Sequence, residues 1–226
     1  MKKVIVTGAN GFIAKNLIAQ LKKTKDIEIC EITRLTTINQ LFDFTKDCDF
    51  VYHFAHDFKT HSNGMTEMLI ACLEKFQNYA PILFTSSIHA DTDTPYGKSK
   101  SADEKLLTQY ASQNNTTAFI YRLPHIFGRW QKPNAQSAVT TFCHNIANDL
   151  PVTIHDQQTT LNLVYIDDLV KEFLNPTGKI PPAHTATLKE IVDTLQGFKS
   201  GKSPTTDFQK ALFATYKSYV DKPEKE

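Results

Sequence analysis

A tyrosine and a lysine four positions apart are the residues whose types and spacing most directly indicate chemistry. Pro95 suits the first position of a helix, and Thr94 before it can serve as the N-cap. Tyr96 and Lys100 then share one face of that helix. A phenol loses its proton near pH ~10, and a neighbouring ammonium group favours the phenolate, so this tyrosine could act as an acid or base nearer neutrality. An ordinary lysine-rich helix start would carry the same short pattern. The other motifs of the sequence must therefore distinguish a catalytic pair from a plain helix start.

Two serines stand upstream of this pair, at the end of an apolar run. Pro81–Thr85 is typical of a buried strand that delivers Ser86 and Ser87 at its carboxyl end. Ligands bind at that end of the strands in an open α/β sheet. Ser87 is therefore the candidate third member of the set, although Thr85 and Ser86 lie close enough to compete for the role.

A glycine-containing turn near the N-terminus indicates a dinucleotide site. Residues 3–7 form a short β-branched run, and Gly8-x-x-Gly11-x-x-Ala14 then opens an amphipathic helix. Glycines at such a turn let the backbone approach a pyrophosphate, while the helix N-terminus supplies N–H donors. A plain tight turn would use the same glycines, but the position between strand and helix favours dinucleotide binding.

The end of the second predicted strand, residues 26–33, bears on which dinucleotide binds. An acidic residue at this point would bind the ribose 2′-hydroxyl of NAD. The strand ends instead at Thr33 and Arg34, and a guanidinium beside a hydroxyl suits a 2′-phosphate. We therefore expect NADP, with NADPH favoured over NADH. Glu31 argues for NAD, although strand alternation can point it away, and Arg34 could also be a plain surface charge.

The alternation of strands and helices predicts an α/β fold with a doubly wound parallel sheet, the Rossmann fold. Further strands are expected at 49–55 and 117–123, and helices at 38–46, from residue 63 and at 96–112. Prolines and glycines punctuate shorter elements after Pro124. We expect one domain over residues 1–226 without an independent second core. Residues 1–123 would form mainly the dinucleotide-binding core and 124–226 mainly a small C-terminal substrate-binding lobe, with 162–174 returning to the core.

Composition excludes several classes of protein. The 226 residues are 41% hydrophobic, enough for a sizeable core, and the formal net charge of +1 gives no attraction to nucleic acid or anionic membrane. The first apolar run, Val4–Val6, is far too short for an export or membrane segment. We therefore expect a cytoplasmic protein with neither nucleic acid nor membrane as a partner.

Cysteines and histidines do not indicate a metal site. The four scattered cysteines lack a Cys-x-x-Cys pair and are typical of the core of a reduced protein; they are Cys30, Cys48, Cys72 and Cys143. Five histidines show no metal-ligand spacing and are interpreted as structural; they are His53, His56, His89, His125 and His144. His125 is kept as a residue that could reach substrate.

Taken together, the motifs over residues ~1–175 resemble the extended short-chain dehydrogenase/reductase family, of the NAD-dependent epimerase/dehydratase type. The resemblance rests on seven segments, which are Thr7–Ala14, His53–His56, Asn63–Thr66, Thr85–Ser87, Tyr96–Glu104, Arg122–Gly128 and Tyr165–Asp168. The sequence departs from the family pattern at His56, where glycine is usual, at His125, where asparagine is usual, and at Phe127, where tyrosine is usual.

The resemblance implies a role for each matching residue. Ser87 would bind the substrate carbonyl, Tyr96 would donate its proton, and Lys100 would lower the pKa of the tyrosine and bind the nicotinamide ribose. The implied cofactor contacts are Gly8, Asn10, Gly11, Phe12, Ile13, Arg34, Phe54, Ala55, Tyr96 and Lys100. Family members commonly pair through a four-helix interface that includes the Tyr-Lys helix, which implies a homodimer.

A narrower resemblance involves Tyr121–Asn134 and Ser137–Ala147. These segments are similar to the reductase half of bacterial capsular-polysaccharide enzymes, which reduce a UDP-linked 4-keto-6-deoxy-N-acetylhexosamine with NADPH. This implies a UDP-sugar substrate; the candidate contacts are Arg129, Lys132 and Asn134 for the diphosphate and His125 for the sugar. A solvated polar loop is the alternative. Those enzymes carry a C-terminal cupin domain for an epimerisation, and the sequence ends at Glu226, about where that domain would begin. Either any epimerisation needs a separate protein, or the chain is a fragment or a related single-activity enzyme.

The residues after Ser87 limit which reactions of the family this chain could catalyse. Sugar-nucleotide dehydratases of the family usually have Asp-Glu immediately after the catalytic serine or threonine, whereas Ile88 and His89 stand here. The acid and base for removing water are therefore missing, which favours reduction of a ketone. Two alternatives stay open: an NAD-dependent nucleotide-sugar 4-epimerase, and a non-catalytic NADP-binding sensor or scaffold.

Overall fold

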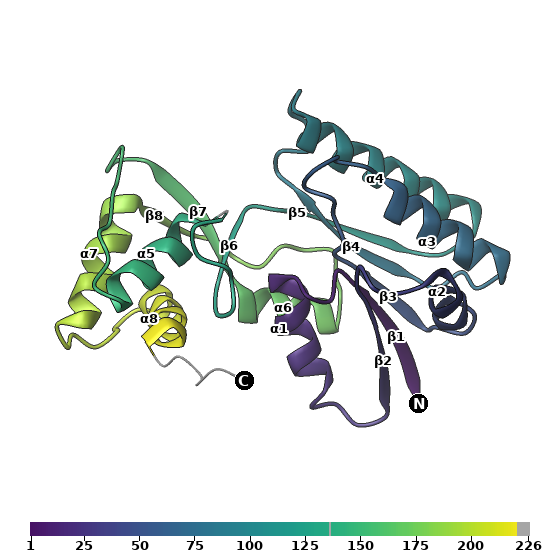
Figure 1. Cartoon of the computed structure of the whole chain (residues 1–226), viewed down its shortest axis with the longest axis horizontal. Coiled ribbons are helices and arrows are strands. Elements are labelled where there is room, and N and C mark those ends of the chain that lie inside the picture. The colour runs from purple at the N-terminus through teal and green to yellow at the C-terminus, as the bar shows by residue number, and fades with distance from the viewer. Residues whose placement is uncertain (136, 221–226) are drawn as a thin grey trace. The chain divides into compact units, whose positions relative to one another are not determined.

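The computed structural model describes residues 1–135 and 137–220, and it divides the chain into two compact units (Figure 1). The first unit comprises Met1–Leu123 and Val170–Ile180. The second comprises Pro124–Leu169 and the chain from Pro181 onward. One boundary thus falls at Pro124, where the sequence analysis also divided the chain.

The first unit contains five parallel strands, which are β1 (Lys2–Thr7), β2 (Ile27–Ile32), β3 (Phe50–His53), β4 (Ile82–Ser87) and β5 (Ala118–Leu123). Their order is β2-β1-β3-β4-β5. Every residue of β3 and β4 is buried, as expected for strands covered on both faces. The predicted parallel sheet is confirmed.

Helices cover both faces of this sheet. They are α1 (Phe12–Leu21), α2 (Ile38–Thr45), α3 (Gly64–Lys75) and α4 (Pro95–Gln113). Leu41, Leu69 and Leu107, from α2, α3 and α4, belong to one hydrophobic cluster with Ile5 and Phe84 of the sheet. Figure 1 shows α1 on the other side of the sheet from α3 and α4. The doubly wound arrangement follows.

The strand order reverses between β1 and β3, because the chain leaves β1 for β2 on one side and returns to β3 on the other. Such a switch point opens a crevice at the carboxyl ends of the two strands, where ligands of doubly wound folds bind. Gly8 follows β1 and Phe54 follows β3. The fold therefore places the glycine turn at the expected ligand-binding edge.

The second unit has its own sheet and its own core. Its strands are β6 (His125–Phe127), β7 (Thr160–Tyr165) and β8 (His184–Thr187), with β6 parallel and β8 antiparallel to β7. Its helices include α5 (Ala138–Ala147), α7 (Leu188–Lys199) and α8 (Asp207–Val220). These elements enclose a second cluster that contains Phe127, Phe142, Leu163, Leu195 and Leu212. The expectation of no independent second core was wrong.

The segment that returns to the first unit also differs from the expected 162–174. β7 stays in the second unit because its backbone pairs with β6 and β8, and the returning segment is Val170–Ile180. The helix α6 (Ile166–Leu174) runs across this boundary. Phe173 packs in the first unit against Phe54 and Tyr121, with ring centroids 5.7 and 5.0 Å apart. Aromatic packing, together with the hydrogen bond that the Tyr121 hydroxyl donates to Glu172 at 2.6 Å, holds the returning segment without any sheet pairing.

Across the parts of the chain that the structure describes, no helix combines the length and apolar character needed to cross a membrane.

Candidate active site

The helix that carries Tyr96 and Lys100 begins as predicted. Pro95 is the first residue of α4, and the Thr94 hydroxyl accepts a hydrogen bond from the Gly97 N–H at 3.0 Å. Gly97 lies tightly under the turn that precedes the helix. A Cβ there would lie 2.4 Å from the His89 carbonyl oxygen and 2.5 Å from Thr92 Oγ1, closer than real contacts allow. Only glycine fits, so the turn between β4 and α4 fixes where Tyr96 emerges.

The side chain of Lys100 is buried between this helix and strand β4. The residue is 4% exposed, its Nζ donates to the Thr85 carbonyl at 2.9 Å, and it lies 4.6 Å from the centroid of the Phe84 ring. Burial lowers the pKa of Lys100 to about 8, although Asp103 and Glu104 act in the opposite direction. The amine is therefore ready to exchange a proton near neutrality.

The serines at the end of β4 have different partners. The Ser86 hydroxyl donates to Glu104, whereas Ser87 Oγ accepts the His89 N–H at 3.2 Å and keeps its own proton for another acceptor. Both serines are buried. This difference supports Ser87, of the two, as the hydroxyl available to a substrate.

A charged brace joins the elements that carry these groups. Arg122 of β5 donates to both oxygens of Glu104 at 2.9 and 2.7 Å, and to Asp91 at 2.6 Å. Burial raises the pKa of Glu104, but hydrogen bonds from Arg122 and Ser86 outweigh it and hold that pKa below its usual value. Glu104 therefore stays ionised and ties the end of β4, strand β5 and helix α4 together.

The glycine turn has the geometry of a phosphate-binding loop. Gly8 has φ of +64°, and a Cβ there would lie 2.9 Å from the Ala55 backbone nitrogen. The Gly11 N–H donates to the Gly8 carbonyl at 2.7 Å, and α1 begins at Phe12 with Gly11 as a cap that has no side chain. The first N–H groups of α1, at Phe12 and Ile13, are left for an anion. Asn10 is exposed at the tip of this turn. The cradle fits a dinucleotide pyrophosphate.

Thr7 joins this turn to the end of β3. Its hydroxyl oxygen accepts the backbone N–H groups of Phe54 and Ala55, both at 3.1 Å. The structure thus brings the candidate cofactor residues at Gly8, Phe54 and Ala55 to one edge of the sheet.

Arg34 lies two residues beyond β2, exposed in a turn closed by the Thr36 N–H on the Thr33 carbonyl at 3.2 Å. Its charge contributes to the lowered pKa of Asp57, after hydrogen bonds from Thr60 and Lys59. Glu31, the acidic alternative, pairs with Lys22 at 3.0 Å. Arg34 is thus exposed just beyond the end of β2, and Glu31 is already paired with Lys22.

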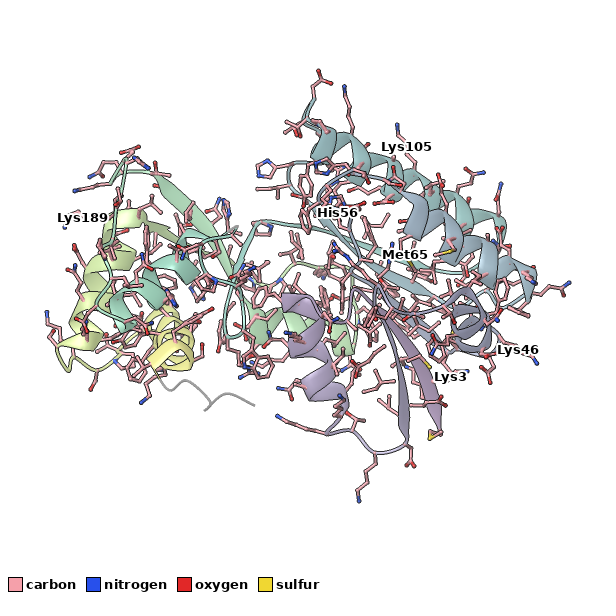
Figure 2. The ribbon with its side chains drawn as sticks, viewed as in Figure 1. Lys3, Lys46, His56, Met65, Lys105 and Lys189 are labelled. Atoms are coloured by element: carbon pink, nitrogen blue, oxygen red, sulfur yellow. The ribbon has the colours of Figure 1, made fainter. Side chains whose placement is uncertain are left out.

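Sequence reasoning missed an aromatic cluster around Tyr96. The His56 ring lies 5.2 Å from the Tyr96 ring in an edge-on contact, and Phe58 and His61 lie 6.3 and 6.1 Å from it. His56, labelled in Figure 2, also contacts His61, with Nε2 and Nδ1 3.2 Å apart. Burial and the charge of Lys100 lower the pKa of His56 to about 4, so its ring is neutral. The departure from the family's glycine at His56 was the signal that could have identified this contact.

The candidate substrate residues belong to the second unit. Arg129 pairs with Asp167 at 3.0 Å and lies 5.0 Å from the Trp130 ring centroid. The Asn134 N–H donates to Thr141 Oγ1 at 3.0 Å, while the side chains of Lys132 and His125 are exposed. Ser87, Tyr96 and Lys100 belong to the first unit.

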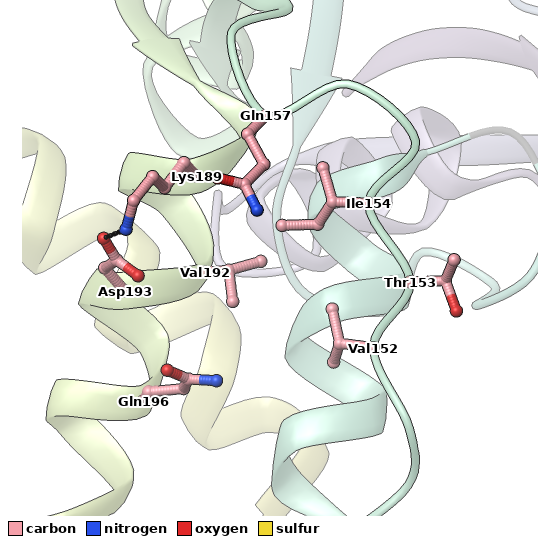
Figure 3. Close-up of a pocket in the computed structure, with 8 residues that line it drawn as sticks. All are labelled: Val152, Thr153, Ile154, Gln157, Lys189, Val192, Asp193 and Gln196. Carbon is pink, nitrogen blue, oxygen red and sulfur yellow. Dashed lines mark hydrogen bonds and ion pairs between the residues drawn. The ribbon is translucent and has the colours of Figure 1, made fainter.

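A hollow of about 450 Å³ in the second unit lies between the loop at 152–157 and α7 (Figure 3). Val152, Ile154 and Val192 line it, together with a Lys189–Asp193 ion pair that largely cancels its own charge. None of the candidate catalytic, cofactor or substrate residues lines this hollow. It is therefore distinct from the candidate active site.

Metal-binding groups do not gather in the part of the chain that the structure describes. Among the described residues, no set of three or more histidine, cysteine, aspartate or glutamate side chains could hold a metal ion. The four cysteines are free and buried, which confirms their interpretation as core residues.

Comparison with known proteins gives the family. A model described as the NAD dependent epimerase/dehydratase family matches residues 74–175, which include Ser87, Tyr96 and Lys100. The crystal structure of the capsular polysaccharide assembling protein CapF from Staphylococcus aureus superposes with a TM-score of 0.88 at 35% identity, covering 98% of this chain and 68% of that one. This chain belongs to the NAD-dependent epimerase/dehydratase family.

Another relative is the UDP-2-acetamido-2,6-beta-L-arabino-hexul-4-ose reductase of Pseudomonas aeruginosa, which is 36% identical over 241 residues. That match covers 96% of this chain and 65% of the relative, so the chain spans about two thirds of that protein's length. The UDP-glucuronic acid 4-epimerase from Bacillus cereus in complex with NAD has a TM-score of 0.78 at 20% identity and shows the fold alone. The glycine cradle, which a Cβ would fill, agrees with the dinucleotide dependence of the epimerase/dehydratase family.

Proposed function

We propose that this chain is an oxidoreductase that uses NADPH to reduce the 4-keto group of a UDP-linked 4-keto-6-deoxy-N-acetylhexosamine in the biosynthesis of a surface polysaccharide. The observation that carries the proposal is the position of Tyr96 and Lys100 in the first turns of α4, with Lys100 hydrogen-bonded to the strand that ends at Ser87, in a chain 36% identical to a UDP-hexulose reductase. A protein that only bound the dinucleotide would have no need of this set.

The first unit holds the cofactor in this proposal. The N–H groups at the start of α1 and the cradle at Gly8 and Gly11 bind the pyrophosphate, with Asn10 beside them. Phe54 and Ala55 line the same edge, Lys100 binds the nicotinamide ribose, and Arg34 binds the 2′-phosphate that distinguishes NADPH. When bound, the nicotinamide dinucleotide supplies the hydride.

The protein groups act on the carbonyl oxygen and its proton. Ser87 donates a hydrogen bond to that oxygen while the His89 N–H holds Ser87 Oγ in place at 3.2 Å. Tyr96 gives its proton to the developing alkoxide, so the carbonyl gains one hydride and one proton and becomes an alcohol. The charge of Lys100 stabilises the phenolate left on Tyr96, which then regains a proton from solvent.

The second unit supplies the substrate contacts in this proposal. Arg129, Lys132 and Asn134 bind the UDP diphosphate, a group that guanidinium and ammonium donors recognise well. Asp167 supports the guanidinium of Arg129 at 3.0 Å. His125 reaches the sugar. Because Ile88 and His89 follow Ser87, the site lacks an adjacent acid and base for removing water, which favours reduction alone.

Incubation of the purified protein with a UDP-4-keto-6-deoxy sugar and either NADPH or NADH tests the proposal, with the absorbance of the reduced nicotinamide followed over time. Substrate-dependent oxidation is expected. Interconversion of UDP-sugars without net oxidation would indicate a 4-epimerase, and dinucleotide binding without turnover would indicate a sensor. Arg34→Ala should raise the KM for NADPH and leave that for NADH unchanged; equal effects would overturn the role of Arg34.

We also propose that the protein is a cytoplasmic homodimer that pairs through a bundle of helices including α4. Light scattering on the full chain, whose monomer mass is 25.6 kDa, should give twice that value. A monomer mass at assay concentration would contradict the dimer without affecting the proposed reaction.

A further inference from the structure

A buried chain of hydrogen bonds crosses the first unit from the end of β1 to α4. It links Thr7 Oγ1 to His53 Nδ1 at 2.7 Å, His53 Nε2 to Thr66 Oγ1 at 2.9 Å, and Thr66 Oγ1 to Asp103 Oδ1 at 2.6 Å. The four side chains are between 0% and 3% exposed. Polar groups buried this deeply depend on one another for partners.

The donors in this chain have a single consistent order. Thr66 donates its hydroxyl proton to Asp103, so its oxygen accepts the N–H at Nε2 of His53. Nδ1 of the neutral imidazole then accepts the hydroxyl proton of Thr7. The oxygen of Thr7 in turn accepts the N–H groups of Phe54 and Ala55. Burial, with Lys100 and His56 nearby, lowers the pKa of His53 to about 3, in agreement with a neutral ring.

The two ends of the chain lie at two different parts of the site. One end fixes the backbone of Phe54 and Ala55 against Gly8 in the dinucleotide cradle. The other end holds α4 beside Lys100, because Asn63 Nδ2 donates to the Ser99 carbonyl at 2.8 Å and Asn63 also hydrogen-bonds Asp103. His53 is the residue whose two nitrogens join these ends.

We propose that His53 is a positioning residue that couples the dinucleotide cradle to the helix that carries Tyr96 and Lys100. The inference rests on the proposed function, since it assigns the cradle to the cofactor and α4 to proton transfer. Its consequence is that the hydrogen bonds on the two sides of His53 can be removed by separate substitutions. Loss of the bond to Thr7 should weaken cofactor binding, and loss of the bond to Thr66 should slow turnover.

Two substitutions at His53 remove these hydrogen bonds separately. A glutamine side chain reaches about the position of Nε2, so His53→Gln keeps a donor for Thr66 and loses the acceptor for Thr7. An asparagine side chain reaches about the position of Nδ1, so His53→Asn keeps the acceptor for Thr7 and loses the donor for Thr66. One buried hydrogen bond corresponds to a change of about tenfold. We expect His53→Gln to raise the Kd for NADPH by about that factor, and His53→Asn to lower kcat by a similar factor at nearly unchanged Kd.

Thr45→Val is the matched control. Thr45 is also fully buried, and its hydroxyl donates to the Leu41 carbonyl at 2.8 Å within α2. This variant should lose comparable stability yet keep both the Kd for NADPH and kcat. Thr66→Val should behave like His53→Asn, and Thr66→Ser, which keeps the hydroxyl, should restore kcat. All kinetics are measured below the melting temperature of the least stable variant. If the His53 variants do not fold, Thr66→Val and Thr66→Ser test the same inference.

The inference is overturned if the His53 and Thr66 variants change Kd and kcat no more than Thr45→Val does. It is also overturned if each of these variants changes Kd and kcat together. Hydrogen exchange of residues 99–103 gives a test that needs no sugar: NADPH should slow it in the wild type and in Thr66→Ser but not in Thr66→Val. Equal slowing in all three would also overturn the coupling. A wild type that binds neither NADPH nor NADH would instead overturn the proposed function itself.

Discussion

The candidate functional groups of the two units differ in their exposure to solvent. In the first, Lys100 is 4% and Ser87 6% exposed, and each is fixed by a backbone partner. In the second, Lys132, Asn134 and His125 are exposed. Groups that transfer protons need fixed positions and a shielded environment, whereas groups that recognise a charged ligand must be reached from solvent. Under the proposed function, we therefore predict that changes in the first unit affect the reaction itself and that changes in the second affect affinity.

The largest expected effect is that of Tyr96→Phe in the first unit. Removing the phenol hydroxyl removes the proposed proton donor, so kcat should fall by about 10²–10⁴-fold while the Kd for NADPH stays the same. Steady-state kinetics and a dinucleotide fluorescence titration measure both quantities. Tyr79→Phe, at a 41% exposed tyrosine, is the control and should have wild-type kinetics. Retained activity in Tyr96→Phe would refute the catalytic assignment.

Arg129→Ala in the second unit should act on affinity. Loss of the proposed diphosphate contact should raise the KM for the UDP-sugar by about tenfold, with kcat changed by less than about threefold. Asp167→Asn is the companion variant, because it removes the charge that pairs with Arg129 at 3.0 Å and leaves the guanidinium in place. A fall in kcat at constant KM would contradict the division between the units.

The buried amine of Lys100 predicts how stability depends on pH. Its pKa is about 8 in the folded chain against an ordinary value of 10.5, so between these values the unfolded chain binds more protons. Stability attributable to this group therefore rises as the pH increases from about 8 to 10.5. Chemical denaturation of wild type and Lys100→Met over this range should show the rise in the wild type alone. Parallel pH profiles would mean that the amine is not desolvated.

The smallest expected effect belongs to His56→Gly, which restores the residue usual in the family. Losing one ring contact with Tyr96 should change kcat by about two- to fivefold, which corresponds to the lower part of the about 0.5–1.5 kcal/mol that aromatic pairs contribute. The companion variant is Phe58→Ala, which removes another ring that lies against Tyr96. A glycine substitution at His144 would be a poor control, because His144 lies inside α5. Identical kinetics in wild type and both variants would show that the aromatic cluster does not influence Tyr96.

Local patterns predicted the first unit well because its elements follow from short stretches of sequence. The cap at Thr94, the strand before Gly8 and the serines at the end of β4 all lie where their neighbours indicate. The strand β6 was missed because its three residues show no periodicity. β8, with four residues, was missed for the same reason, and with it the second core.

The contacts around the site depended on the fold and not on local pattern. Thr7 and His53 are 46 positions apart, and Thr66 and Asp103 are 37 apart. The sequence around each residue therefore does not predict these hydrogen bonds. The approach of His56 to Tyr96 depends on the path of the loop after β3, in which His61 has φ of +52°. Such contacts follow only once the strand order has placed the loops together.

The buried cysteines make the two units separately observable. Cys48 lies in the first unit and Cys143 in the second, at 4% and 0% exposure, and burial raises the pKa of both thiols, that of Cys48 to about 12. A thiol in such surroundings reacts with an alkylating reagent only when its unit opens. Mass spectrometry of alkylated peptides would therefore report the opening rate of each unit in the same sample, without any label being introduced.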